Sequence, residues 1–269
     1  MLEKLFKLSA NKTDAKTEVL AGITTFMTMA YILAVNPNIL SATGMDSGAV
    51  FTATALAAFL GTLLMAIFAN YPFALAPGMG LNAYFAYTVV IGMGYSWQYA
   101  LTAVFAEGIV FIILSLTNVR EAIFNAIPLN LKSAVSVGIG LFIAFIGLQN
   151  AKIVVDGATL VGLYSFKASV QNGTFSTEGI TVLLALIGIL ITAVLLVKQV
   201  KGGILWGILA TWILGIICQL AGIYQVNPEA GAYSLLPDFS NGIAIPSMAP
   251  TLMKMDFSSM FSLDFFAVV

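Results

Sequence analysis

Long apolar runs constrain this sequence more than any other feature. Seven runs of roughly 18 or more residues are separated by polar turns or loops. About 20 helical residues cross the hydrocarbon core of a bilayer, so each run is a candidate transmembrane helix. The candidates are residues 19–40, 48–69, 71–91, 97–117, 131–148, 179–197 and 203–224. We therefore expect an all-α integral membrane protein.

Composition supports a lipid-facing exterior and excludes several classes of function. Hydrophobic residues make up 60% of the chain and charged residues 9%, and the mean hydropathy is +1.00. The single cysteine, Cys218, allows no internal disulfide, and the chain has no histidine. We therefore expect no metal and no cofactor, and any proton relay must use Asp or Glu. The net charge of -1 gives no indication of a nucleic-acid partner.

Basic residues orient the predicted spans. With a cytoplasmic N-terminus, eight Lys and Arg residues fall inside: Lys4, Lys7, Lys12, Lys16, Arg120, Lys132, Lys198 and Lys201. Three fall outside: Lys152, Lys167 and Lys254. This bias follows the positive-inside rule and predicts a multi-pass protein with a cytoplasmic N-terminus. The compact loops fit the cell (inner) membrane of a bacterium.

The spans divide the chain into four expected regions. Residues 1–18 form a cytoplasmic N-terminal segment, either an interfacial helix or a disordered tail, and residues 19–224 form a seven-span repeat. Residues 225–259 form an external connecting loop, and residues 260–269 begin an eighth span. Residues 150–178 are a further external loop, and 118–130 an interfacial helix. Because the eighth run stops at Val269 without a polar tail, we expect a longer protein whose C-terminal half is missing.

The third run contains the strongest functional signal. Two prolines and two glycines between residues 72 and 80 cannot sit in a regular spanning helix. We expect an extended stretch through about Ala76, then a half-helix from about Pro77. The free amides of Gly78, Met79 and Gly80 would form a positive helix end near the membrane midplane, where transporters with broken helices bind their ligands. The alternative is a kinked structural helix that uses glycine for packing.

Two polar residues inside apolar runs are further candidates. Asn82 lies one turn into the half-helix, and its amide offers donors and an acceptor to a flat polar ligand. A hydrogen bond between helices is the other reading of Asn82. Glu107 is the only acid well inside an apolar run. It is a candidate for proton coupling or, equally, a neutral structural group.

Three segments closely resemble the AzgA-like purine permeases of the nucleobase:cation symporter family. They are TTFMTMAYIL at 24–33, APGMGLNAYF at 76–85 and GIGLFIAFIGLQN at 138–150. The resemblance implies import of hypoxanthine, guanine or adenine, driven by protons or sodium. It also implies two inverted repeats of seven spans with substrate between a core and a gate domain. The third and tenth spans would be half-helices preceded by short strands. A homodimer is compatible with this resemblance.

The resemblance also assigns half of a binding site. It places substrate against Gly78, Met79, Gly80 and Asn82, with Thr25 and Phe26 on the first span as additional candidates. The family's acidic residues on the eighth and tenth spans lie beyond residue 269. The 269 residues alone should therefore bind purine poorly and transport little.

Three other classes compete with a purine permease. An anion transporter or channel of the same architecture would use the half-helix dipole for an anion. A structural membrane subunit would need no site. An enzyme is disfavoured because the sequence shows no nucleophile–base pair, metal cluster or cofactor motif.

Overall fold

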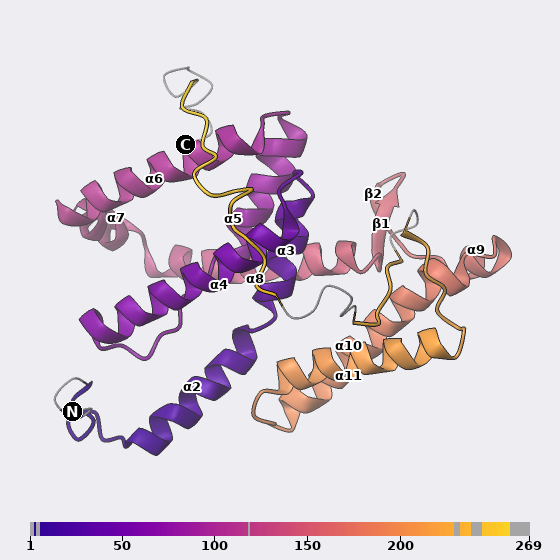
Figure 1. Ribbon diagram of the computed structural model, residues 1–269, viewed down its shortest axis with the longest axis horizontal. Coiled ribbons are helices and arrows are strands. Elements are labelled where there is room, and N and C mark those ends of the chain that lie inside the picture. The colour runs from indigo at the N-terminus through magenta and orange to yellow at the C-terminus, as the bar shows by residue number, and fades with distance from the viewer. Residues whose placement is uncertain (1–2, 4–5, 118, 229–231, 238–243, 259–269) are drawn as a thin grey trace. The chain divides into compact units, whose positions relative to one another are not determined.

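The computed structural model describes residues 3, 6–117, 119–228, 232–237 and 244–258 (Figure 1). The chain separates into two compact units. Unit 1 comprises Met1–Tyr31 and Ala144–Ala244, and unit 2 comprises Ile32–Ile143 and Ile245–Val269. The eighth apolar run and part of the N-terminal segment lie outside the described residues.

Six helices among the described residues are long and apolar enough to cross a membrane. They are Ala15–Ser41, Ser47–Ala69, Trp97–Leu116, Leu129–Asn150, Phe175–Val197 and Gly203–Leu220. These helices coincide with six of the seven expected spans. The other expected span, 71–91, contains the shorter apolar helix Met79–Gly92. The larger part of this helix, Tyr84–Gly92, is a π-helix. Even at the α-helical rise of about 1.5 Å per residue the helix would be no longer than about 21 Å, short of the roughly 30 Å hydrocarbon core.

Unit 1 is helical with one small sheet. Its elements are α2 (Ala15–Met29), β1 (Val154–Gly157), β2 (Leu160–Leu163), α9 (Phe166–Gln171), η3 (Phe175–Gly179), α10 (Ile180–Val197) and α11 (Gly203–Leu220). The chain is mostly helical, as an all-α membrane protein should be, and the segment 150–178, expected as an external loop, contains β1, β2 and α9. β1 and β2 form an antiparallel hairpin, from the pair Val154↔Leu163 to the pair Gly157↔Leu160. The β-branched residues of this segment favour strands.

The helices α10 and α11 pack through two reciprocal glycine–threonine contacts. A Cβ placed on Gly188 would lie 2.5 Å from Thr211 Oγ1, and Gly207 is covered in the same way by Thr192. Each threonine hydroxyl donates to the carbonyl four residues earlier in its own helix, Thr192 to Gly188 at 2.8 Å and Thr211 to Gly207 at 2.7 Å. The hydroxyls are thus satisfied locally, while the glycines let the two helices approach closely.

Unit 2 holds the helices around the predicted site. They are α3 (Ile32–Ser41), α4 (Ser47–Leu64), η1 (Met65–Ala69), α5 (Met79–Ala83), η2 (Tyr84–Gly92), α6 (Trp97–Leu116), α7 (Val119–Ala126) and most of α8 (Leu129–Asn150). Asp46 caps α4 by accepting from the Ala49 amide at 2.7 Å, and Ser96 caps α6 by accepting from the Tyr99 amide at 3.2 Å. A buried cluster joins these elements: Met45, Val50, Phe85, Val89 and Ala100.

The segment expected to form an interfacial helix is helical at α7. Arg120 on α7 lies 4.4 Å from the Phe111 ring centroid, and Lys132 on the following helix α8 lies 3.9 Å from the Phe124 ring centroid on α7. Cation–π contacts of this kind let a basic side chain lie along apolar surface.

We predict that Gly188→Ala destabilises the protein. The new methyl group would overlap Thr211, and overpacking of this kind costs about 1–3 kcal/mol. Thermal unfolding of the detergent-purified protein would measure the loss. Gly147→Ala on α8 is the matched control, because a Cβ there meets nothing within 4 Å. Adding Thr211→Ala should restore part of the stability, and equal melting temperatures for both glycine variants would contradict the packing described.

Candidate functional site

The third apolar run is interrupted at its prolines and glycines, as their positions predict. Residues 70–78 are neither helix nor strand, and α5 begins at Met79. Asn70, with φ of 54°, ends η1 in the left-handed conformation. The Thr62 hydroxyl on α4 accepts from the Leu75 amide at 2.9 Å and contacts the Leu75 carbonyl oxygen at 3.3 Å. This hydroxyl therefore serves both backbone groups of Leu75, as non-helical chain at membrane depth requires.

The short helix begins with a glycine cap. Gly78 is the N-cap, with φ of −79° and ψ of 112° and no side-chain cap, and its carbonyl accepts from the Asn82 amide at 3.1 Å. The first amides of a helix have no partner within the helix, which leaves those of Met79 and Gly80 directed out of its end. A Cβ on Gly78 would meet nothing within 4 Å, and one on Gly80 would come no closer than 3.7 Å to Phe142. Gly78 and Gly80 therefore have free space beside them where a side chain would stand.

A chain of polar side chains meets the short helix. Asn82 on α5 donates through Nδ2 to Asn36 Oδ1 on α3 at 2.5 Å. Asn36 donates through Nδ2 to Thr54 Oγ1 on α4 at 2.6 Å. Asn36 and Thr54 are each 3% exposed, and Asn82 is half-buried. We call these three residues the amide relay.

Sequence reasoning found only one member of the amide relay. The sequence predicts Asn82 because it follows the glycines of the half-helix, whereas Asn36 and Thr54 belong to the site only by the contacts that the structure shows. Asn36 did carry a signal, since it is an amide inside an apolar run, directly before Pro37. Polar residues in spanning helices usually bond to a partner on another helix.

The remaining predicted residues lie outside the amide relay. Glu107 is exposed on α6, and no described residue forms a hydrogen bond or ion pair with it. Thr25 and Phe26 lie on α2 in unit 1. Thr25 donates to the Ala21 carbonyl at 2.9 Å, and Phe26 is 60% exposed. Within the described part of the chain, no cluster of three or more His, Cys, Asp or Glu residues could hold a metal ion.

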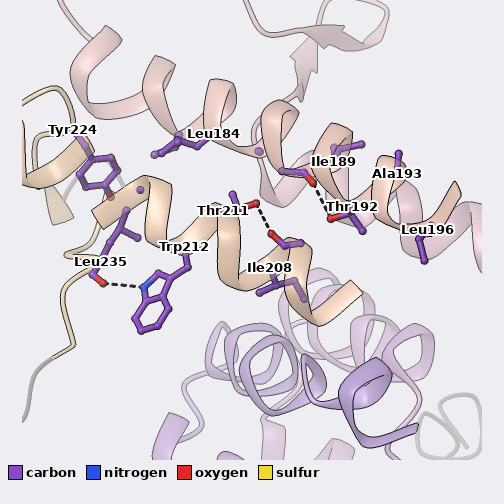
Figure 2. Close-up of a pocket in the computed structure, with 15 residues that line it drawn as sticks. Leu184, Ile189, Thr192, Ala193, Leu196, Ile208, Thr211, Trp212, Tyr224 and Leu235 are labelled. Carbon is purple, nitrogen blue, oxygen red and sulfur yellow. Dashed lines mark hydrogen bonds between the residues drawn. The ribbon is translucent and has the colours of Figure 1, made fainter. Parts of the chain in front are cut away.

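A groove of about 720 Å³ lies between α10 and α11 in unit 1 (Figure 2). Five polar side chains line it, and each donates to a backbone carbonyl: Thr181, Thr192, Thr211, Trp212 and Tyr224. Figure 2 shows the Trp212 indole bonded to the Leu235 carbonyl, at 2.9 Å. The Tyr224 phenol donates to the Tyr233 carbonyl at 2.6 Å. With their donors engaged, these side chains make the groove a weaker candidate for a polar ligand than the amide relay.

Comparison with known proteins identifies the family. The sequence profile of the permease family (Xan_ur_permease) matches residues 16–267. The chain belongs to this family. Guanine/hypoxanthine permease PbuO of Bacillus subtilis is 48% identical over 244 residues, which cover 90% of this chain and 52% of that protein. Adenine permease AdeP of Escherichia coli is 40% identical over 253 residues, which cover 91% of this chain and 54% of that protein.

A third relative matches over a similar share of both chains. Guanine/hypoxanthine permease PbuG of Bacillus subtilis is 41% identical over 261 residues, which cover 93% of this chain and 53% of that protein. The chain thus spans about half the length of the curated relatives it matches. Family membership and six candidate spans make it a multi-pass membrane protein of a transporter family, not an enzyme.

We expect Gly78→Ala and Gly80→Ala to leave the fold intact. Both positions have room for a methyl group, so the free energy of unfolding should change by no more than about 0.5 kcal/mol. Gly48→Ala provides the contrast, because its Cβ would lie 2.8 Å from Pro246 Cβ. Melting temperatures of the three purified variants check this. A loss at Gly80 as large as that at Gly48 would show that the open helix end is described wrongly.

Proposed function

We propose that the chain forms part of a secondary active transporter that imports purine nucleobases by alternating access. The bases would be guanine, hypoxanthine or adenine. The observation that carries this proposal is the amide relay beside the open N-terminal end of the short helix. Similarity over most of the chain to proteins named as guanine/hypoxanthine and adenine permeases supports the same substrate class.

The proposed site matches the chemistry of a purine. Gly78 and Gly80 leave the helix end open to a flat ring, and Met79 lies between them. Asn82 supplies an amide, which pairs with a purine edge that carries both donors and acceptors. Thr25 and Phe26 on the first span remain proposed contributors.

The proposal includes the transporter's architecture. The chain would supply the first seven-span repeat of two inverted repeats, with its N-terminus in the cytoplasm of a cell-membrane protein. Because the relatives are nearly twice as long, a second half would complete the binding site and supply its acids. In such transporters the ligand site lies near the midplane, where broken helices meet.

The amide relay favours a neutral ligand over an anion. The side chains that meet at α5 are two amides and a hydroxyl, whereas a dedicated anion site commonly adds Arg or Lys. A base that is neutral near pH 7 needs directional hydrogen bonds rather than charge. We therefore place the purine transporter ahead of an anion transporter of the same architecture.

Uptake of radiolabelled purines tests this function directly. The full-length gene product would be expressed in cells without purine permeases of their own, and guanine, hypoxanthine and adenine supplied separately. We expect saturable uptake by the parent protein. Asn82→Ala should reduce uptake at low substrate concentration by roughly tenfold or more, because a buried polar contact to the ligand is lost.

Asn38→Ala is the matched control for this substitution. Asn38 is an exposed amide on α3, and it lies outside the amide relay. Its loss should leave uptake near that of the parent at equal membrane abundance. Absence of purine uptake by a well-inserted parent would refute the proposed substrate, and unchanged uptake by Asn82→Ala would refute the proposed site.

Glu107 is the proposed proton-coupling group. We expect Glu107→Gln to abolish purine accumulation driven by an imposed pH gradient while leaving purine exchange without a gradient intact, because glutamine cannot bind and release a proton. Reconstituted vesicles allow both measurements. Glu121→Gln, which changes an exposed acid on α7, should alter neither. Accumulation by Glu107→Gln equal to the parent's, or a requirement for sodium, would contradict this role.

A further inference from the structure

We propose that Asn36 is a positioning residue for substrate recognition, one that fixes the carboxamide of Asn82 in the orientation that binds the purine. This inference rests on the proposed function and deepens it. Asn36 itself is 3% exposed and lies behind Asn82. It would act on the ligand only through Asn82.

The hydrogen bonds of the relay define this orientation. A carboxamide has one acceptor oxygen and two N–H donors. Asn82 donates one of its N–H groups to Asn36 Oδ1, and Asn36 donates one of its N–H groups to Thr54 Oγ1. Among the described residues, no donor reaches Asn82 Oδ1. Asn82 therefore presents an acceptor oxygen and one remaining N–H.

That presentation selects a pattern on the ligand. A 6-oxopurine carries a ring N–H beside a carbonyl oxygen, and adenine carries an amino group beside a ring nitrogen. Each places a donor next to an acceptor and can pair with the oxygen and N–H of one carboxamide. An amide turned over by 180° would present the reverse order of donor and acceptor. The direction of the relay thus sets which edge of the base is recognised.

Burial ties the two carboxamides of the relay to each other. Asn36 lies on α3 directly before Pro37, which is also buried, and proline restricts the backbone on both sides of the bond. Thr54 is likewise 3% exposed on α4. Turning one of the two amides over without the other would set two groups of the same kind against each other in a buried place, which is costly. The orientation of the Asn82 carboxamide is therefore tied to that of Asn36. Three helices therefore cooperate to hold one side chain of the site.

A double-mutant cycle separates positioning from a general structural role. The parent, Asn36→Leu, Asn82→Ala and the combined variant would be compared in the full-length protein by the KM and maximal rate of hypoxanthine uptake. We expect Asn36→Leu to raise KM roughly tenfold, with a change in maximal rate below about twofold at matched abundance. In the Asn82→Ala background the same substitution should change KM by less than about twofold, because its effect passes through Asn82. Asn38→Leu, on the exposed side of α3, should behave as the parent.

Selectivity supplies a second readout. The parent should discriminate against 1-methylhypoxanthine, which lacks the N1–H beside the carbonyl, more strongly than Asn36→Leu does. A variant that was merely less stable would lower the rate for both ligands together. If Asn36→Leu fails to insert, Thr54→Val takes its place in the cycle, with an expected rise in KM of roughly threefold.

The possible results lead to different conclusions. KM effects of Asn36→Leu and Asn82→Ala that multiply independently would overturn the positioning role, as would a loss confined to abundance or maximal rate. Unchanged selectivity in a well-inserted variant would also overturn it. If the parent transports no purine, the proposed function fails first. If it transports purine and the cycle is additive, only this inference fails.

Discussion

Hydrocarbon offers no hydrogen bonds, so each peptide group of this chain that lies at membrane depth must find its partner within the protein. Helices meet this requirement along most of the chain. The stretch 70–78 does not, and its position beside α4 follows from the same requirement, since Thr62 serves both backbone groups of Leu75. The interruption removes helical hydrogen bonds from the third span. As a result a helix begins at Met79, near the middle of the expected span 71–91.

The threonines of α10 and α11 and the side chains of the amide relay form different kinds of hydrogen bond. In unit 1 the threonines of α10 and α11 donate to carbonyls of their own helices. In unit 2, Asn36 and Asn82 bond to other side chains instead. A hydroxyl bonded to its own backbone leaves an apolar helix face, suited to packing. An amide bonded through only some of its groups keeps hydrogen-bonding capacity for a ligand. This difference is the physical reason for seeking the site at the amide relay in unit 2 rather than in the groove of unit 1.

Local sequence patterns predicted the features that depend on one segment at a time. The spanning helices follow from run length, and the start of α5 follows from Pro77 and Gly78. The hairpin at 154–163 was missed because polar and glycine residues there were interpreted as loop, although Val154 and Val155 favour a strand. Thr62, Asn36 and Thr54 were missed for another reason. Their roles depend on a partner far along the chain, and no spacing in one segment specifies that partner. The placement of Asn82 in a binding site remains a prediction.

The reciprocal contacts between α10 and α11 have a consequence for how the protein is made. The glycine and threonine of each helix are four residues apart, and the helices are joined by the short turn at 198–202. Every group in these contacts belongs to the pair itself. Helices that insert separately associate within the bilayer when small residues let their backbones meet. The pair can therefore close soon after its second helix leaves the ribosome, which would give later segments a formed surface to dock on during synthesis.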